Sequence, residues 1–488
     1  MPARLLPLLL WAALCPASPQ PAQLQRIDPA GIGGTLVLAG SHTTELAATA
    51  FLKSAGQLEE NKNILFFSGD DSKPARETLR ILKQQLPEGR LTQTCDITGL
   101  IDKLDHAHAL WLGGVHTKSL APHAQALRAF LRSGKTVGTS ASGPAQELLP
   151  DAHIGTPTNN SPLQHAPHRV AYELDADAAL LIRGRLIRSI GPGQVRIHRK
   201  VHHGHPPATL TLSPENPLAD LTALRRTAQD ATIQPPPKAP RPIVRKGTLI
   251  LIGGGGMPTG IVQRFVKLAG GKDARIVVLP TAAPDPIRKP YRIDATFRKA
   301  GAGKVTVLPG RTLETVEGPK SLAALKEATG LWFGGGRQWR FVDAYLDTQA
   351  HPLMHDVLRR GGVVMGSSAG ASIQAGYLAR GNPLGNLDIM APGYERGLGF
   401  LPGVAVDQHF SQRNRFTDMK ALTQAHPHLL GIGIDESTAL IVRKKTGEVT
   451  GKGKVFFYDN RAGTGPRQTA VHSGERFNLV TRKLHMAR

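Results

Sequence analysis

An internal repeat is the feature of this sequence that most constrains its fold. Four short segments of the first half return in the same order in the second half. They are residues 34–40 and 247–253, 110–114 and 331–335, 138–141 and 366–369, and 174–180 and 434–440. Each is an apolar run that leads into glycine, aspartate or serine, as a buried parallel strand does where it enters its loop. The repeat therefore predicts two copies of one domain, here called copy one and copy two.

Helical patterns lie between these segments, for example at 124–131 and 353–358. Alternation of strand and helix predicts an α/β domain with a mainly parallel sheet covered on both faces. A chain of 488 residues is long enough for two such domains. The proline-rich run 234–242 can join neither sheet nor helix, so it marks the boundary. We assign copy one to 30–232, a linker to 233–245 and copy two to 246–488.

The first residues have the pattern of a secretory signal peptide, which we place at 1–22. Arg4 precedes an apolar run at 5–14, and small residues and prolines follow. Such a run is too short to remain as a stable bilayer anchor. Leu14 stands before Cys15 where lipid attachment would need a small residue, which favours simple cleavage. No later stretch of eighteen apolar residues occurs, so we expect a secreted or periplasmic protein without a membrane span.

Cysteine content and charge further limit the classes of function that this protein can have. Without the signal peptide only Cys95 remains, so a disulfide or a cysteine metal site is not expected. The formal charge is +23, but basic residues are scattered and aromatics make up 5%, which does not favour nucleic-acid binding. The charge suits a basic exported protein better than a binder of acidic polymers. Four histidines, which lack a cysteine or carboxylate partner, are more typical of a solvated basic tail than of a metal site. They are His198, His202, His203 and His205.

Ser368 is the candidate nucleophile. It is the central residue of 366–370, GSSAG, which follows the apolar strand 363–365 and opens a segment with helical spacing. A strand, a sharp turn and a helix are the context in which G-x-S-x-G indicates a hydrolase. The amides at the start of that helix favour a developing negative charge, so we expect Ala369 to contribute to an oxyanion hole. The glycines after the preceding strand, Gly335 and Gly336, are expected to supply further bare amides.

His409 is the candidate base, because it lies at the end of the strand-like segment 403–410. A third group must orient the imidazole and stabilise its charged form. Glu436 and Asp435 both follow the buried strand that ends the second copy of the last repeat, and either could serve. No metal or organic cofactor is expected for this chemistry.

Residues 247–459 resemble the cyanophycinase and aspartyl dipeptidase family of serine peptidases, and the cyanophycinase branch in particular. The resemblance is carried by 265–283 (FVKLAGGKDARIVVLPTAA), 335–338 (GGRQ), 366–371 (GSSAGA), 407–415 (DQHFSQRNR) and 431–439 (GIGIDESTA). It implies two tandem flavodoxin-like three-layer domains related to class I glutamine amidotransferases. It also implies the triad Ser368, His409 and Glu436.

The resemblance further implies five substrate-binding positions. They are Gln338, Asp407, Gln408, Arg413 and Arg415. Two residues depart from the family pattern: Asp418 stands where an arginine is expected, and Arg337 where an asparagine is expected. Both changes alter the charge near the substrate and leave the hydrolytic residues in place.

The spacing of the repeats differs between the copies. Ser140 corresponds to Ser368 with an offset of 228, and Asp175 corresponds to Asp435 with an offset of 260. Copy one has therefore lost a net 32 residues between these positions. In copy two that interval contains 406–410, and we expect no counterpart of this histidine strand in copy one.

Copy one also lacks other site residues. Thr117 replaces Gln338 and Ala176 replaces Glu436, while Ser140 is retained. A serine without a base is a weak nucleophile at neutral pH. Copy one is therefore interpreted as a pseudoenzyme.

The leading hypothesis is an exported serine exopeptidase that hydrolyses β-aspartyl-arginine polymer or dipeptide through an acyl-enzyme on Ser368. A second is a peptidase for other acidic or isoaspartyl peptides, in which Arg413 and Arg415 hold a carboxylate. A third is a non-catalytic envelope protein that binds a polymer. In each case we expect the two copies to pack as an intramolecular pseudo-dimer. Association of whole chains into a homo-oligomer is a further alternative.

Overall fold

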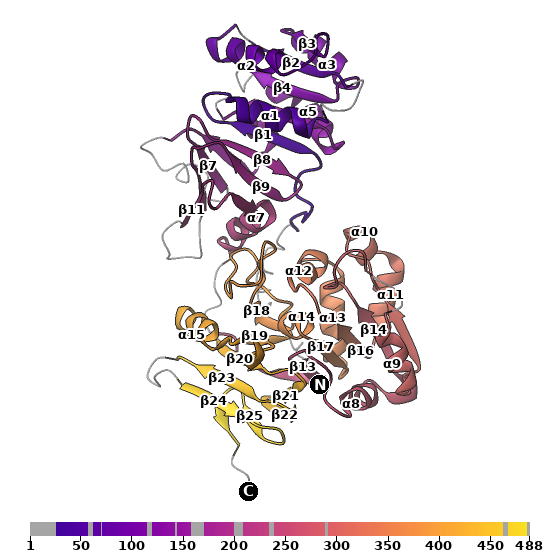
Figure 1. Cartoon of the computed structure of the whole chain (residues 1–488). Helices are drawn as coiled ribbons and strands as arrows, with labels where there is room; N and C mark the ends of the chain where they lie inside the picture. The colour runs from indigo at the N-terminus through magenta and orange to yellow at the C-terminus, as the bar shows by residue number, and fades with distance from the viewer. Residues whose placement is uncertain are drawn as a thin grey trace, which may run out of the picture.

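The computed structural model describes most of the chain. The described residues are 26–56, 62–69, 71–114, 120–141, 144–157, 170–199, 208–233, 239–287, 291–461 and 467–485. The predicted signal peptide, Thr117, His202, His203, His205 and most of the proline-rich run lie outside them. Copy one and copy two form two lobes stacked on one another (Figure 1). No helix in the described part is long and apolar enough to cross a membrane.

Copy one is built on an eight-stranded sheet in the order β12-β9-β8-β1-β5-β4-β2-β3. Its strands are β1 (Thr35–Ala39), β2 (Ile64–Ser68), β3 (Leu91–Thr94), β4 (Ala109–Gly113), β5 (Thr136–Ser140), β8 (Ala179–Arg183), β9 (Leu186–Ile190) and β12 (Leu218–Asp220). The five strands from β1 to β3 in this order are parallel, and β8, β9 and β12 are antiparallel. Helices α1 (Glu45–Ser54) and α2 (Lys73–Gln84) cover one face, and α3 (Ile97–Leu104) and α5 (Ala124–Arg132) cover the other. Helix α7 (Leu221–Asp230) follows β12.

Copy two repeats this plan in a nine-stranded sheet, β15-β14-β16-β17-β13-β21-β22-β25-β26. Its strands are β13 (Val244–Ile252), β14 (Arg275–Leu279), β15 (Lys304–Val307), β16 (Gly330–Phe333), β17 (Val363–Ser367), β21 (Thr438–Lys444), β22 (Thr446–Gly451), β25 (Arg476–Asn478) and β26 (Lys483–Leu484). Helices α8 (Ile261–Leu268) and α9 (Ile293–Lys299) cover one face, and α11 (Pro319–Glu327), α12 (Trp339–Tyr345) and α13 (Ala350–Arg359) cover the other. The predicted α/β class is confirmed. In copy two the strands from β15 to β13 in this order are parallel, and β21, β22, β25 and β26 are antiparallel.

Each copy carries a second, smaller sheet, and these sheets correct one expectation. In copy one, β6 (Ala152–Gly155) runs parallel to β7 (Val170–Leu174), with β10 (Val195–Arg199) and β11 (Ala208–Leu212) beyond. In copy two, β19 (Leu401–Gln408) runs parallel to β20 (Leu430–Ile434), with β18 (Ala375–Tyr377), β23 (Val455–Asp459) and β24 (Arg467–Val471) beside them. Strand β6 therefore occupies the place of β19. The expectation that copy one has no counterpart of the histidine strand is wrong.

The register shows what copy one lost instead. Ala152 pairs with Val170 as Val404 pairs with Leu430, so β6 and β19 correspond with an offset of 252. At that offset Pro157 falls where His409 stands. The strand is kept because it continues the smaller sheet, whereas the histidine at its end is gone.

Most of the missing residues belong to one segment of copy two, residues 378–400, which we call the excursion. The offset grows from 228 at the serines to 252 at β6 and β19, so 24 of the 32 residues are lost between the serine and this strand, the interval that contains the excursion. Copy one passes from Ser140 to β6 through residues 141–151 alone. In copy two the same passage holds α14 (Ala369–Ser372), β18 and the excursion.

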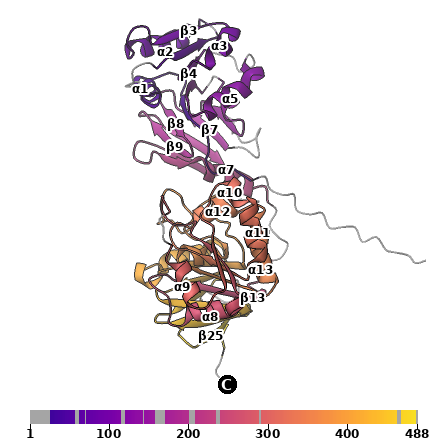
Figure 2. The ribbon, with the colours of Figure 1, turned by 90° about the vertical axis from the view of Figure 1, so that its right-hand side faces the viewer.

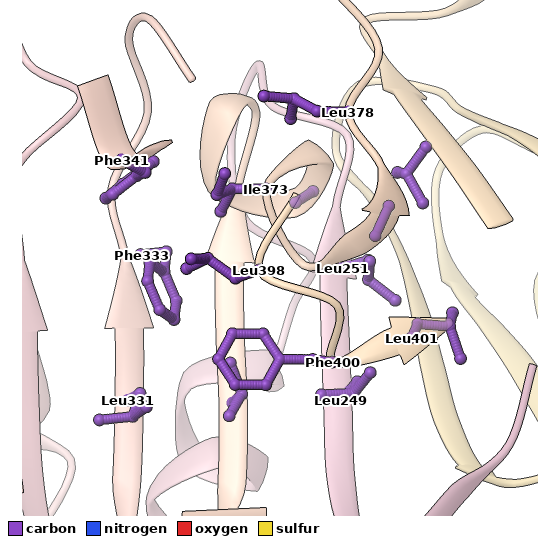
Figure 3. Packing of buried hydrophobic residues seen from close by; sticks show 14 of the residues in the cluster. Leu249, Leu251, Leu331, Phe333, Phe341, Ile373, Leu378, Leu398, Phe400 and Leu401 are labelled. Atoms are coloured by element: carbon purple, nitrogen blue, oxygen red, sulfur yellow. The ribbon is translucent and has the colours of Figure 1, made fainter. Parts of the chain in front are cut away.

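The excursion is anchored in the core of copy two (Figure 3). Its Leu398 and Phe400 are buried against Phe333 at the end of β16, and against the leucines of the sheet. Burying a side chain of this size contributes about 1.5–3 kcal/mol. The C-terminal end of the excursion is therefore packed into the same core as the sheet.

Candidate active site

Ser368 lies on a strained turn at the end of β17. Its φ is +54°, a region that residues with a side chain seldom adopt, and α14 begins at the next residue. A Cβ on Gly366 would lie 2.1 Å from the carbonyl oxygen of Gly370, so only glycine allows this turn. The amide of Ser368 donates to the carbonyl of Ile252 on the neighbouring strand, at 2.9 Å. The turn lifts the hydroxyl above the carboxyl edge of the parallel sheet, as in a nucleophile elbow.

His409 and Glu436 complete a hydrogen-bonded row with this serine. His409 Nε2 lies 3.0 Å from Ser368 Oγ, and His409 Nδ1 lies 2.5 Å from Glu436 Oε1. His409 follows β19 and has a φ of +50°, so a second strained residue faces the first. The row has the geometry of a nucleophile, a base and a carboxylate that orients the base.

Asp435, the rival for the third position, has a different role. Its Oδ1 accepts from the amide and the hydroxyl of Ser411, at 3.0 and 2.6 Å, and its Oδ2 accepts from the amide of Lys454 at 3.0 Å. Neighbouring residues at a strand end face opposite ways, which separates it from Glu436. Asp435 therefore fixes the ends of two strands, and Glu436 contacts the imidazole.

Two glycines that the sequence reasoning missed make room for this row. A Cβ on Gly254 would lie 2.3 Å from the imidazole of His409, and a Cβ on Gly255 would lie 2.3 Å from the carboxylate of Glu436. Both have positive φ, at +93° and +63°. The signal was present as four successive glycines, Gly253 to Gly256, directly after β13. Bare backbone at this point lets the base and its carboxylate approach the serine.

The environment keeps His409 uncharged at neutral pH. Partial burial lowers its pKa below the ordinary value, and the nearby Arg413 and Arg415 lower it further, while Glu436 acts in the opposite direction. A neutral imidazole can accept the serine proton, whereas a protonated one cannot. The balance therefore favours the form of His409 that a base requires.

The predicted oxyanion hole lies on the other side of Ser368. A Cβ on Gly335 would approach the Cβ of Ser368 to 3.5 Å, and Gly336 lines the cavity beside it. The amides of Gly334 and Arg337, on either side, donate to the carbonyls of Leu279 and Ala282 and hold this loop in place. Ala369 is the first residue of α14, next to the nucleophile. The role of these amides stays a prediction.

A cavity of about 250 Å³ opens beside Ser368. Its lining consists of Gly336, Arg337, Gln338, Ser368, Arg380, Asn386, Gln408, Arg413 and Arg415. Four of these side chains are guanidinium groups, and no carboxylate is among them. A cavity so lined attracts negatively charged groups and suits bidentate contacts to a carboxylate.

Of the five predicted substrate positions, four line this cavity and Asp407 does not. Asp407 is fully buried beneath it. Its carboxylate accepts from Arg415 Nη1 at 2.6 Å and from Arg380 Nε at 3.0 Å. Asp407 therefore holds two cavity arginines from below, which is a positioning role. Gln408 does reach the serine, with its Oε1 3.3 Å from Ser368 Oγ.

Arg380 is a cavity residue that sequence reasoning missed. It lies in the excursion with a φ of +58° and is 4% exposed. Its Nη2 donates to Asp418 at 2.5 Å, and Nη1 donates to the carbonyl of Leu387 at 2.6 Å. Asp418, which stands where the resemblance predicts an arginine, is thus the counter-ion of an arginine supplied from another segment. The unexpected charge of Asp418 was the only signal in the sequence.

Copy one keeps the serine but has lost the base and the carboxylate of this arrangement. Pro157 and Ala176 stand where copy two has His409 and Glu436. The positions of the two accommodating glycines, Gly254 and Gly255, hold Ser41 and His42. These replacements support the interpretation of copy one as a pseudoenzyme.

The histidine cluster of copy one also differs from expectation, in so far as it is described. His198 lies on β10, and its Nε2 is 2.9 Å from Glu173 Oε2, so it is not part of a solvated tail and does have a carboxylate partner. Within the described ranges, no group of three or more His, Cys, Asp or Glu is placed to hold a metal ion. Contacts to Glu173 on β7 and Thr209 on β11 orient the ring on the strand.

The fold and the serine–histidine–glutamate row define a serine hydrolase of the α/β class. Comparison with known proteins gives the family: residues 249–450 match the model of peptidase family S51. Cyanophycinase from Trichormus variabilis is 33% identical over 233 residues, which cover 46% of this chain and 77% of that one. Cyanophycinase from Geminocystis herdmanii is 34% identical over 232 residues, which cover 46% and 84%. The chain therefore belongs to peptidase family S51 and is a hydrolase of the serine peptidase type, as the sequence resemblance predicted.

Solved structures of similar proteins were found as well. A peptidase from an acI-B1 Actinobacterium matches with a TM-score of 0.36 and 22% identity, covering 48% of this chain and 97% of that one. A putative peptidase E from Listeria monocytogenes EGD-e matches with a TM-score of 0.29 and 17% identity, covering 46% and 100%.

Proposed function

We propose that this protein is an exported serine exopeptidase of the cyanophycinase type, which hydrolyses β-aspartyl-arginine polymer or dipeptide. The observation that carries the proposal is the arginine-lined cavity directly beside Ser368. A β-linked aspartyl residue keeps its own α-carboxylate close to the scissile bond. Guanidinium groups bind a carboxylate through paired, charge-assisted hydrogen bonds. Such a contact would place the β-carbonyl carbon over the serine hydroxyl.

The geometry supports an acyl-enzyme mechanism. Ser368 Oγ attacks the scissile carbonyl carbon, and its proton passes to His409 Nε2, 3.0 Å away. Glu436 accepts the hydrogen bond from Nδ1 and stabilises the imidazolium. When the C–N bond breaks, His409 returns the proton to the leaving amine. Water then attacks the ester through the same base, which releases the acid and restores the serine.

The amides of Gly335, Gly336 and Ala369 are the proposed donors to the carbonyl oxygen in both steps. Negative charge develops on that oxygen as the tetrahedral intermediate forms. Removal of a single donor of this kind typically costs about 10²–10³ in turnover. These hydrogen bonds therefore stabilise the transition state and the tetrahedral intermediate more than they stabilise the bound substrate.

A second candidate, a peptidase for other acidic or isoaspartyl peptides, is favoured by one specific observation. Arg337 and Arg380 bring the guanidinium groups at the cavity to four, and Asp418 is already engaged by Arg380. An arginine side chain of the substrate would meet like charges there, whereas an acidic side chain would be attracted. The two candidates share the β-aspartyl carboxylate and differ in the residue attached to it.

The location and assembly of the protein are also proposed. The pattern of residues 1–22 supports export to the periplasm or the medium. The ion pairs from Arg185 and Arg226 of copy one to Asp343 of copy two support an intramolecular pseudo-dimer. Analytical ultracentrifugation would show whether whole chains associate further.

The substrate can be tested with the purified protein. Incubation with cyanophycin should release β-aspartyl-arginine, detected by mass spectrometry, and Ser368→Ala protein should release none. A panel of isoaspartyl dipeptides with arginine, glutamate, alanine or leucine as second residue separates the two candidates. Faster cleavage of the glutamate peptide than of cyanophycin would support the second candidate. Failure on every β-linked substrate, with activity on ordinary α-linked peptides, would overturn both.

A further inference from the structure

The contact between the copies is centred on one buried carboxylate, Asp343 of α12. It is 8% exposed. Arg185 and Arg226 of copy one each donate to it at 2.6 Å. Arg26, which precedes β1, donates to its backbone carbonyl at 2.9 Å. A carboxylate removed from water in this way is stable only while its partners remain.

Helix α7 of copy one carries Arg226, and it lies at the junction of the lobes beside α12 in both views (Figure 1 and Figure 2). Asp220 caps α7 by accepting from the amide of Ala223, and it also holds Arg185 at 2.6 and 2.9 Å. Arg185 is thereby pre-positioned to reach copy two. Its guanidinium also lies over the ring of Trp339, at 5.1 Å, where a cation–π contact adds to the ion pair.

The excursion takes part in the same contact. Tyr394 donates to Asp343 at 2.7 Å, and the guanidinium of Arg226 lies over its ring at 4.7 Å. At Gly393, with a φ of +83°, a Cβ would lie 2.1 Å from the carbonyl oxygen of Ala223. Backbone therefore meets backbone between α7 and the excursion. We call Arg185, Arg226, Asp343 and Tyr394 the clasp.

The clasp joins α12 to the excursion, and a further contact joins them near the substrate cavity. This contact is made by Gln338, the residue before α12, whose Nε2 donates to the carbonyls of Ala379 and Arg380 at 2.9 and 2.8 Å. Gln338 and Arg380 both line the substrate cavity. Asp343 lies little more than one helical turn after Gln338, so movement at one contact is transmitted to the other along a rigid element.

We propose that copy one is a positioning subunit: through the clasp it holds α12 and the excursion together, and so keeps Gln338 and Arg380 in the substrate cavity. Arg185 and Arg226 are positioning residues that contact no reacting atom. The proposal extends the pseudo-dimer, which needs only association, and it rests on the proposed use of the cavity for substrate carboxylates. The triad itself is built from β17, β19 and β20 with their following residues, and it does not depend on the clasp.

Because the triad does not depend on the clasp, the effect of the clasp on the cavity can be measured separately from the reactivity of Ser368. A neutral alkyl fluorophosphonate labels Ser368 through the triad alone, whereas a fluorophosphonate bearing a carboxylate also needs the cavity arginines. The ratio of the two labelling rates therefore reports on the cavity whatever the natural substrate is. In the full chain, Arg226→Met should lower this ratio roughly 3- to 30-fold while the neutral rate stays near that of the wild type. Arg226→Lys, which keeps the charge, should recover part of the ratio.

A matched control is Arg80→Met, because Arg80 lies on α2 of copy one and pairs only locally, with Glu77. Its ratio should equal that of the wild type. If Arg226→Met destabilises the protein too far, Arg396→Met is the milder variant. Arg396 joins Asp230 of α7 to Asp347, and its removal leaves the ion pairs of Asp343 in place. Circular dichroism and the neutral probe show that each variant is folded.

Two results would overturn the inference alone: a folded Arg226→Met protein with an unchanged ratio, or equal loss of both labelling rates. A wild-type protein that does not prefer the charged probe would instead overturn the carboxylate-binding function, and the inference with it.

Discussion

The two copies share a scaffold and differ at the ends of its strands. Gly40 and Gly253 occupy matching positions, and a Cβ on either would lie 2.1 Å from the carbonyl oxygen of Asp175 or Asp435. Those two aspartates make the same bond, accepting from a backbone amide at 3.0 Å in each copy. One residue further along, Gly254 faces His409 in copy two, and Ser41 takes its place in copy one.

The difference shows which constraints belong to the fold and which to catalysis. Residues that close the sheets are retained in both copies, because their loss would unpair buried backbone groups. Gly254 and Gly255 are needed only while an imidazole and a carboxylate press against them. Once Pro157 and Ala176 replaced those groups, a side chain could occupy the space.

The largest expected effect is the difference in hydrolysis rate between substitutions of the two serines, Ser368 and Ser140. Ser368→Ala should lower hydrolysis by about 10⁴-fold or more, because the nucleophile is lost. Ser140→Ala should leave the rate unchanged, since copy one has Pro157 and Ala176 in place of the base and its carboxylate. Steady-state rates with the best substrate, together with circular dichroism, decide the matter. Comparable losses from both substitutions would sink the pseudoenzyme interpretation.

The next contrast is between the neighbouring carboxylates. Glu436→Gln should lower kcat roughly 10²- to 10⁴-fold, because the imidazole loses its orienting acceptor. Asp435→Asn should cost less than about tenfold in kcat, and mainly stability, since Asp435 holds backbone amides as Asp175 does. Rates and thermal unfolding of both variants are the measurement. The reverse order of effects would reassign the third member of the triad.

A smaller effect is expected at the glycine that distinguishes the copies. Gly254→Ala places a methyl group against the ring of His409, and a displacement of about 1 Å typically costs roughly 10²-fold in rate. The matched change in copy one, Ser41→Ala, should have no effect on the rate. Fluorophosphonate labelling of folded protein compares the two, and equal rates would show that the His409 contact is not limiting.

The fragment 239–488 tests whether copy two depends on copy one. Without copy one, Asp343 loses Arg185 and Arg226, and the surface of copy two that they cover is exposed to water. Denaturant unfolding should show a lower free energy of unfolding than that of the full chain, or the fragment should self-associate. A monomeric fragment with undiminished stability and activity would rule the pseudo-dimer out.

The smallest effect concerns pH and is confined to copy two. His351 and His355 of α13 both contact the carbonyl of Leu398, and burial lowers the pKa of His355 to about 4. The folded pKa lies below the unfolded value of about 6.5, so the unfolded state binds more protons between them. Stability is therefore complete above about pH 6.5 and falls as the pH drops towards 4, by roughly 1–3 kcal/mol.

Denaturant unfolding at pH 7 and pH 5 measures this slope. His355→Leu should make it shallower, because one titrating group is removed, while His351 and His409, whose pKa values burial also lowers, keep the remainder. An unchanged slope in His355→Leu protein would assign the pH dependence to other groups.

Sequence alone was enough for the scaffold and the nucleophile. Apolar runs ending in small residues specified the strands β1, β13, β4, β16, β5 and β17, and the turn chemistry around Ser368 is local. Strand β6 was missed because its four residues, Ala152–Gly155, are too short and too weakly apolar to stand out. It is ordered by pairing with β7, which is a long-range contact.

The cavity and the clasp were beyond reach for the same reason. Arg380 and Asp418 are 38 residues apart, and nothing local indicates that they meet. Asp343 and Arg185 are separated by 158 residues and belong to different copies. Ion pairs of this kind are set by the packing of the elements that carry them, and a charge pattern along the chain does not reveal them.

The asymmetry of the contact between the lobes limits how whole chains can assemble. The lobes are joined through unlike surfaces, since α7 of copy one meets the excursion of copy two. Unlike surfaces that stay open can propagate into rings or filaments. Here copy one lacks the excursion, so it has no surface that could bind the α7 of another molecule. The corresponding surface of copy two is already covered by α7 of its own chain. The shortening that removed the excursion from copy one thus also stops head-to-tail growth through this contact.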